Sequence, residues 1–146
     1  MLFSKKQFVI IVGCGRLGAT LAGDLSYKGY DISIIDKNKY AFEDLPDNFS
    51  GYQINADGTD AGILENVGIE KATMLLAVTD NDNVNSMVAQ IAKKIYNVPN
   101  VYARFNHPDM EELVKEDGIK VIYPFKLSGD EFERLSSIDV PSNDEG

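Results

Sequence analysis

The chain has 146 residues, 44% of them hydrophobic and 25% charged, with a formal net charge of −9. This length and composition are typical of one globular domain with a single core. The acidic balance argues against a nucleic-acid surface, because duplex binding depends largely on lysines and arginines that neutralise phosphates. It does not exclude a small site for one anionic ligand, which can be locally positive on an acidic protein.

Cysteine content and hydropathy favour a cytosolic domain. Cys14 is the only cysteine, so no internal disulfide can form and a reducing compartment is favoured. No stretch approaches the roughly 18 consecutive apolar residues needed to cross a bilayer. The apolar run near the start breaks at Gly13, which makes it too short for a signal peptide. We therefore expect no direct insertion into a membrane.

Short β-branched runs alternate with longer amphipathic stretches along the chain. The apolar run 8–13 predicts a buried strand, and 16–29 predicts a helix that Gly29 closes. The later expected elements are a strand at 31–36, a short helix at 39–46, a strand at 51–57, a short helix at 60–69, a strand at 72–79, a helix at 83–97, a strand at 100–105, a helix at 108–117, a strand at 120–124 and a helix at 126–138.

Strands that alternate with helices predict right-handed βαβ crossovers and a parallel sheet. The stretch 72–79 is apolar except for Thr73 and Thr79, as expected of a central parallel strand. The sequence thus predicts an α/β fold, a Rossmann-like doubly wound parallel six-stranded sheet with helices on both faces. Residues 1–135 are expected to form this domain, and the polar residues 136–146 a tail or linker stub.

Three glycines with the spacing GxGxxG lie between the first expected strand and the first expected helix. This is the context that a dinucleotide-binding loop requires. Gly13 would permit a tight turn, Gly15 would let the backbone approach a pyrophosphate, and Gly18 would let the helix pack closely on the sheet. A turn without a ligand is the alternative. The candidate phosphate-binding residues are Gly13, Cys14, Gly15, Arg16, Leu17 and Gly18.

Asp36 ends the second expected strand. A carboxylate there can accept hydrogen bonds from ribose hydroxyls and would repel a 2′-phosphate, which favours NAD or a plain adenine nucleotide over NADP. Lys37 and Lys39 weaken that discrimination, since a neighbouring lysine could tolerate an extra phosphate. A helix cap is the alternative role for Asp36.

Arg16 would suit a highly charged ligand, or a sensor that distinguishes ligands by phosphate number. A solvated side chain at the helix start is the alternative.

No catalytic set accompanies this loop. His107, the only histidine, is expected in a surface or capping role, and Cys14 is expected to be a small buried residue rather than a reactive thiol. The acidic stretch 79–83 lacks the spacing of a calcium loop.

Six separated stretches together resemble one known family, the RCK or KTN N-terminal (TrkA-N) domain of Trk/Ktr-type potassium uptake systems. The similarity extends from about Phe8 to about Leu135. The stretches are GCGRLGATLA (13–22), IID (34–36), ADGTD (56–60), MLLAVTDNDNVNSMVAQIAKK (74–94), VYARFNHP (101–108) and VIYP (121–124).

The resemblance implies a regulatory cytoplasmic subunit, peripheral at the inner face of the cell membrane. It would bind NAD(H) or ATP/ADP and gate an integral-membrane potassium-translocating subunit. By position, the glycine loop with Arg16 would hold the phosphates and Asp36 the adenosine ribose. Asp57 would lie beside the adenine and ribose, with Lys37 as a lesser contact.

The same carry-over places three residues at the mouth of the cleft. Thr79 and Asp80 follow the fourth expected strand and Arg104 belongs to the end of the fifth, and an open α/β sheet binds its ligand outside these carboxyl ends. A structural ion pair between Asp57 and Arg104 is the alternative.

Self-association into a dimer, with an octameric ring as a further step, is also implied by the resemblance. The stretch 121–135 supplies more apolar residues than a small sheet edge needs, which favours an interface. Completion of the domain's own core is the alternative. These residues are Ile122, Tyr123, Phe125, Leu127, Phe132 and Leu135.

Two other functions remain open. An NAD-dependent oxidoreductase, or part of one, would need a nicotinamide pocket with an acid or base. A purely structural module would bind no nucleotide. Family members commonly carry a second, smaller ligand-sensing domain after this one, and its properties are not carried over.

Overall fold

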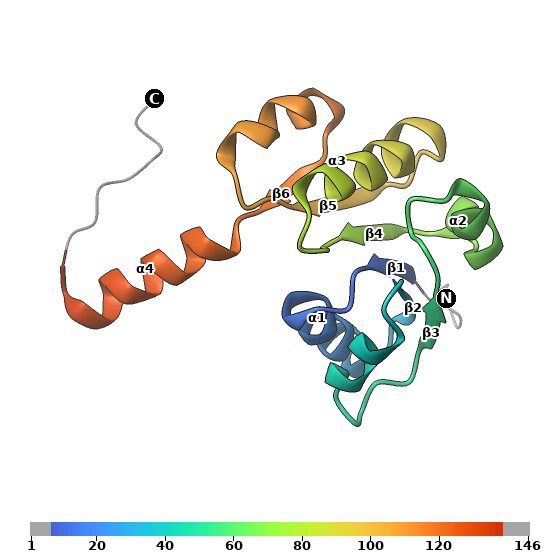
Figure 1. Ribbon diagram of the computed structural model, residues 1–146, viewed down its shortest axis with the longest axis horizontal. Helices are drawn as coiled ribbons and strands as arrows, with labels where there is room; N and C mark the ends of the chain where they lie inside the picture. The colour runs from blue at the N-terminus through green and yellow to red at the C-terminus, as the bar shows by residue number, and fades with distance from the viewer. Residues whose placement is uncertain (1–6, 139–146) are drawn as a thin grey trace, which may run out of the picture.

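The six expected strands form one sheet in the computed structural model, which describes residues 7–138 (Figure 1). The elements are β1 Phe8–Val12, α1 Arg16–Tyr27, β2 Asp31–Asp36, η1 Lys39–Asp44, β3 Tyr52–Asn55, α2 Ala61–Val67, η2 Ile69–Lys71, β4 Met74–Ala77, α3 Asp82–Gln90, η3 Ile91–Ile95, β5 Asn100–Arg104, η4 Pro108–Leu113, η5 Lys115–Asp117, β6 Lys120–Ile122 and α4 Pro124–Ser136.

All neighbouring strands are parallel, in the order β3-β2-β1-β4-β5-β6. The first three strands extend the sheet in one direction from β1, and the last three extend it in the other direction from β4. The carboxyl ends of all six strands therefore lie along one edge, and the winding reverses between β1 and β4. This topology confirms the predicted doubly wound, Rossmann-like α/β fold.

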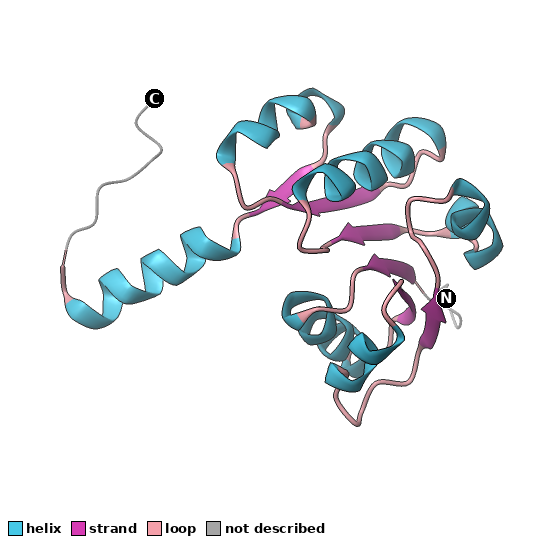
Figure 2. Cartoon of the chain, in the orientation of Figure 1, coloured by secondary structure: helices cyan, strands magenta, loops and turns pink. Residues whose placement is uncertain are grey.

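Two apolar clusters cover the two faces of the sheet, because successive strand residues point to opposite sides. Val9 and Ile11 of β1 pack with residues of α1 and η1. Ile10 and Val12 pack with residues of α2 and α3. Figure 2 shows helices on both sides of the central strands. Burial of these alternating side chains is the main force that holds the layers together.

Several helical segments differ in detail from the expectation. The short helices expected at 39–46 and 108–117 are 3₁₀ turns, and none of their residues is fully buried apart from Val114 between the last two turns. A short segment with so little apolar anchoring makes few of the contacts that stabilise a longer α-helix. The helix expected at 83–97 starts at Asp82 and becomes a π-helix at 91–95.

The last helix, α4, starts at Pro124, two residues earlier than expected, because proline suits the first helical position and ends the preceding strand. It projects from the body of the domain (Figure 1), and none of its residues is buried. The idea that its apolar residues complete the core is wrong for four of them. These are Phe125, Leu127, Phe132 and Leu135, all more than half exposed.

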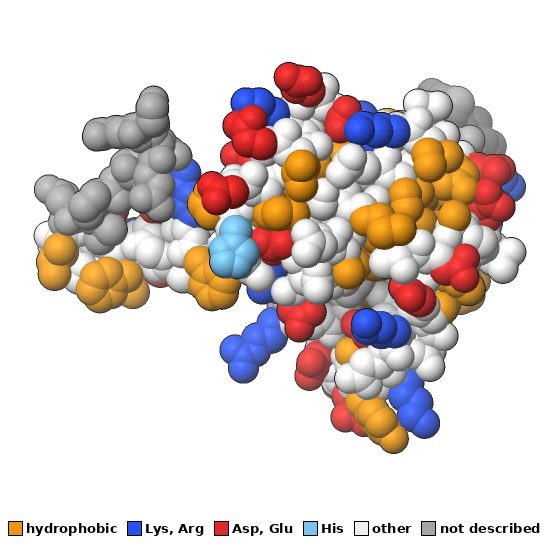
Figure 3. Space-filling model, turned by 45° about the horizontal axis from the view of Figure 1, so that its top comes forward, with side chains coloured by type: hydrophobic (Ala, Val, Ile, Leu, Met, Phe, Trp, Pro, Cys, Tyr) orange, Lys and Arg blue, Asp and Glu red, His pale blue; other side chains and the backbone are white. Residues whose placement is uncertain are grey.

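Apolar side chains gather along the projecting helix in Figure 3. Tyr123, just before α4, is different, since it packs against the main core cluster. Ser136 ends α4. The rest of the expected polar tail from residue 139 onward lies outside the described residues.

Candidate nucleotide-binding site

All twelve candidate residues lie at the carboxyl edge of the sheet. The glycine loop follows β1, Asp36 ends β2, and Asp57 lies just beyond β3. Thr79 and Asp80 follow β4, and Arg104 ends β5. The structure thus brings residues from five strands to one edge, on both sides of the point where the winding reverses. That point is where open α/β sheets bind ligands.

The three glycines of the loop have three different environments. Gly13 has φ +108°, and a Cβ on it would lie 2.8 Å from the backbone nitrogen of Thr79. A Cβ on Gly18 would lie 1.9 Å from the carbonyl oxygen of Gly13. A Cβ on Gly15 would have no protein atom within 4 Å. The fold itself requires Gly13 and Gly18, whereas Gly15 leaves open space at the N-terminus of α1.

Asp36 fastens the loop after β1 to the loop after β2. One carboxylate oxygen accepts from the backbone N–H of Cys14 at 2.8 Å, and the other accepts from the N–H of Asn38 at 2.8 Å. The side-chain cap of η1 is Asn38, not Asp36. A carboxylate oxygen has two acceptor sites, so each oxygen retains room for a ribose hydroxyl.

Asp57 is an exposed carboxylate whose charged form is stabilised locally. One of its oxygens accepts from the hydroxyl of Thr59 at 2.7 Å and from the N–H of Thr59 at 2.9 Å. These two bonds, with a smaller contribution from the nearby charge of Lys37, lower the pKa of Asp57. The Asp57 side chain therefore offers a negatively charged hydrogen-bond acceptor at the carboxyl edge of the sheet.

Arg16 and Leu17 follow the glycine loop at the start of α1 and differ in what they contact. Arg16 is exposed, as expected of a side chain free to meet an anion in front of the helix. Leu17 packs against the core cluster on the α1 side of the sheet. Only the backbone of Leu17 is therefore suited to bind a phosphate.

Asn85 is a residue of this region that the sequence analysis missed. It is fully buried on α3, and its amide oxygen accepts from both the N–H and the hydroxyl of Thr79, at 2.9 and 2.6 Å. Its amide nitrogen donates to the carbonyls of Thr79 and Arg104, at 2.9 and 2.8 Å. An inward-facing polar residue in an otherwise apolar helix face was the available signal, since Val88, Ala89 and Ala92 share that face.

Arg104 directs its guanidinium to a neighbour rather than to Asp57. Its Nε and Nη2 donate to the side-chain oxygen of Asn106, at 3.4 and 3.2 Å. Asp57 bonds to Thr59 instead, so the alternative ion pair between Asp57 and Arg104 does not form. Arg104 is half-buried at the end of β5.

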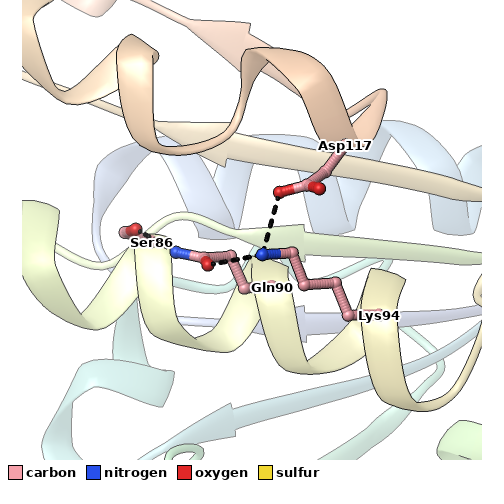
Figure 4. A network of polar contacts seen from close by, with 4 residues as sticks. All are labelled: Ser86, Gln90, Lys94 and Asp117. Atoms are coloured by element: carbon pink, nitrogen blue, oxygen red, sulfur yellow. Dashed lines mark hydrogen bonds and ion pairs between the residues drawn. The ribbon is translucent and has the colours of Figure 1, made fainter.

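A chain of polar contacts extends along α3 away from this edge (Figure 4). The amide of Gln90 donates to the hydroxyl of Ser86 at 2.8 Å, and Lys94 donates to Gln90 at 3.2 Å. Lys94 also pairs with Asp117 of η5 at 3.3 Å. Lys94 is half exposed, so the ion pair itself adds little stability. These contacts nevertheless connect η3, which continues α3, to η5, the turn before β6.

Cys14 is buried in the glycine loop, and its thiol donates to the carbonyl of Ala41 at 3.4 Å. Burial, followed by the negative charges of Asp36 and Asp44, raises the pKa of the thiol to about 11. The structure confirms the prediction that Cys14 is a small buried residue.

We expect Cys14 to react with a disulfide reagent at pH 8 about a hundredfold more slowly in the native protein than in denaturant, because the thiolate is the reactive form. The colour released by dithionitrobenzoate measures both rates. A free cysteine peptide, mixed with the same denaturant, corrects for the effect of the solvent on the reagent. Equal rates in native and denatured protein would contradict the expectation.

Two hollows lie away from the carboxyl edge. One, of about 520 Å³, lies beside α1 and includes Asp24 and Pro46. The other, of about 760 Å³, lies near the amino ends of β1 and β2 and includes Phe8 and Tyr30. Neither hollow contains a candidate residue of the carboxyl edge.

Among residues 7–138, no group of three or more histidine, cysteine, aspartate or glutamate side chains is arranged to hold a metal ion. No helix in the same range is both long and apolar enough to span a bilayer.

The profile of the TrkA-N domain matches residues 9–124, from β1 to the first residue of α4. The chain belongs to the TrkA-N domain family. This confirms the resemblance that the sequence motifs indicated. The match contains the glycine loop and every other candidate residue of the site.

Two curated relatives are named as Trk system potassium uptake protein TrkA. This TrkA-N domain is 32% identical over 126 residues to the protein of Streptomyces coelicolor. It is 34% identical over 134 residues to the protein of Vibrio alginolyticus. The alignments cover 86% and 87% of this chain but 56% and 29% of those proteins. The chain thus spans about half or less of their length.

Solved structures share the fold at low sequence identity. The TrkA-N domain of inner membrane protein ybaL from Escherichia coli has a TM-score of 0.77 at 16% identity, covering 91% of this chain and 98% of that one. The GsuK channel bound to NAD has a TM-score of 0.72 at 16% identity, and the match covers 90% of this chain and 24% of that one. The Kef CTD of Shewanella denitrificans in AMP-bound form has a TM-score of 0.74 at 22% identity, and the match covers 90% of this chain and 81% of that one.

Proposed function

We propose that this TrkA-N domain binds NAD(H) or ATP/ADP at the carboxyl edge of its sheet and regulates a potassium uptake system. The observation that carries the proposal is the glycine loop. Gly13 and Gly18 are held by close backbone contacts, while Gly15 leaves open space before the free N–H groups of α1. A diphosphate fits such a loop, because backbone N–H groups and the helix dipole favour negative charge there.

The residues around the loop suit the rest of an adenine nucleotide. Asp36 has remaining acceptor capacity for the ribose hydroxyls, and Asp57 offers a charged acceptor with Lys37 nearby. Two proteins of the same fold have been solved with NAD and with AMP, which supports an adenine nucleotide here. Arg16 and Arg104 are the cations that we expect to respond to phosphate charge.

Regulation requires that ligands differ in their affinity for two arrangements of the protein, because equal affinity shifts no equilibrium. We propose that the domain self-associates through α4, as a dimer that can stack into an octameric ring. Nucleotide exchange would then change the dimer geometry and gate an integral-membrane potassium-translocating subunit. In this role the domain is cytoplasmic and peripheral at the inner face of the membrane. Relatives named as TrkA support this partner class.

The test is equilibrium binding of NAD, NADH, ADP, ATP and NADPH to the purified chain, measured by calorimetry. We expect adenine nucleotides to bind and NADPH to bind about tenfold or more weakly than NADH, because Asp36 repels a 2′-phosphate. We expect Arg16→Ala to weaken the binding of ATP more than that of ADP, since an exposed arginine contributes mainly by its attraction to the phosphate charges.

Lys28→Ala is the control, because it also removes one positive charge and Lys28 is exposed at the C-terminal end of α1, opposite to the glycine loop and away from α4. Absence of binding by every nucleotide would overturn the proposal and favour a structural module. Oxidation of NADH with a panel of small carbonyl substrates would instead favour the oxidoreductase.

A further inference from the structure

The first turn of α3 joins two loops at the carboxyl edge of the sheet. Asn85 bonds the loop after β4 through Thr79 and the end of β5 through the carbonyl of Arg104. One turn earlier, the carboxylate of Asp82 accepts from the N–H groups of Asn106 and His107, at 2.8 and 3.0 Å. Both loops are thus attached to the same helix.

The amide of Asn85 uses its whole hydrogen-bonding capacity. It can accept two bonds and donate two, and it makes all four to only two residues. Asn85 is fully buried, and a buried amide with every bond made holds its partners in one arrangement. Loss of the amide would leave the carbonyls of Thr79 and Arg104 without this donor.

We propose that Asn85 is a positioning residue of the nucleotide site, which holds the β4 and β5 loops as one unit. In this arrangement Thr79, Asp80 and Arg104 meet the part of the ligand beyond its first phosphate. The inference rests on the proposed function that an adenine nucleotide binds at this edge.

The division of the site into two halves gives the inference its specificity. The glycine loop follows β1, Asp36 ends β2 and Asp57 follows β3. These residues suit the adenosine and its first phosphate. The four hydrogen bonds of Asn85 go instead to Thr79 and Arg104, at the ends of β4 and β5. The remainder of a dinucleotide continues across β4 and β5, where the loops held by Asn85 lie. Removal of the amide should therefore weaken long ligands more than short ones.

The side chain of Arg104 adds a second reason for this division. Asn106 accepts from the guanidinium, and the amide of Asn106 donates to the carbonyl of Asp80 at 3.4 Å. The guanidinium, the loop after β4 and the backbone held by Asn85 therefore form one connected set. A shift of either loop would move the positive charge relative to the ligand.

The experiment measures binding of NAD and AMP to the wild-type chain and to Asn85→Asp. A carboxyl group has at most one proton, so it cannot donate to both carbonyls as the amide does. We expect the Kd for NAD to rise about tenfold or more and the Kd for AMP to rise less than about threefold. Val88→Ala is the matched control, because it removes buried volume from the same helix and none of these bonds. It should change both Kd values by less than about twofold.

If Asn85→Asp does not fold, Asn85→Ser takes its place, and hydrogen exchange adds a readout in the folded protein. The backbone N–H of Thr79 donates to the side-chain oxygen of Asn85, so its hydrogen should exchange with solvent faster in Asn85→Ser. The amide of Gly13, which donates to Ile35, should not change. Equal losses for NAD and AMP, or unchanged NAD binding, would overturn the inference. A wild-type chain that binds neither ligand would overturn the proposed function and the inference with it.

Discussion

Gly18→Ala is expected to lower the free energy of unfolding by about 3 kcal/mol or more. The added methyl carbon would lie 1.9 Å from the carbonyl oxygen of Gly13, with Val78 also close. Backbone atoms cannot rotate away as a flexible side chain can, so α1 would have to move off the sheet. Urea unfolding followed by circular dichroism measures the change.

Two other glycines serve as controls for Gly18. Gly15→Ala should alter the unfolding free energy by less than about 0.5 kcal/mol, because open space surrounds it and its φ of −79° is ordinary for alanine. Gly129→Ala lies inside α4 with open space around it and should not destabilise the protein, since alanine favours a helix. A Gly18→Ala protein as stable as these two would contradict the packing argument.

The second large effect is expected at α4. We expect the chain to dimerise in solution and Phe132→Glu to raise the dimer dissociation constant about a hundredfold, because a buried apolar contact is lost and a charge is desolvated. Phe125, Phe132 and Leu135 are exposed, and their spacing places them on one side of the helix. Analytical ultracentrifugation over a range of concentrations measures the constant.

Tyr27→Glu is the matched control, since Tyr27 is an exposed aromatic residue on α1, on the body of the domain rather than on the projecting helix. It should leave the dissociation constant unchanged. A wild-type chain that stays monomeric at high concentration would contradict the proposed dimer, as would a Phe132→Glu protein that still dimerises.

The strands could be predicted from sequence because their buried faces consist of β-branched and other apolar residues. The run 8–12 is continuously apolar, and the buried interior of 31–36 consists of isoleucines with Ser33 among them, as is typical of strands covered on both faces. The helical segments 39–44 and 108–113 were harder, since six residues of mixed polarity do not distinguish an α-helix from a 3₁₀ helix.

Half of the candidate site followed from local patterns, and half did not. The glycine spacing and Asp36 mark the β1 and β2 loops because backbone geometry restricts the residue types there. The bonds of Asn85 and Asp82 join segments that are far apart in the chain, so no local pattern contains them. Arg104 bonds to Asn106, two residues away, and Asn106 in turn bonds to the carbonyl of Asp80 in the loop after β4, which no local pattern indicates.

The all-parallel sheet has a consequence for how the chain folds. Strand β1 pairs with β2 through Phe8 and Asp31, but its other edge pairs with β4, where Val9 lies opposite Met74. During synthesis on the ribosome, one edge of β1 therefore stays unpaired until the middle of the chain has been synthesised. Such long-range pairing slows folding, because loop closure precedes the stabilising contacts. The carboxyl edge between β1 and β4 is thus complete only after roughly half of the protein has emerged.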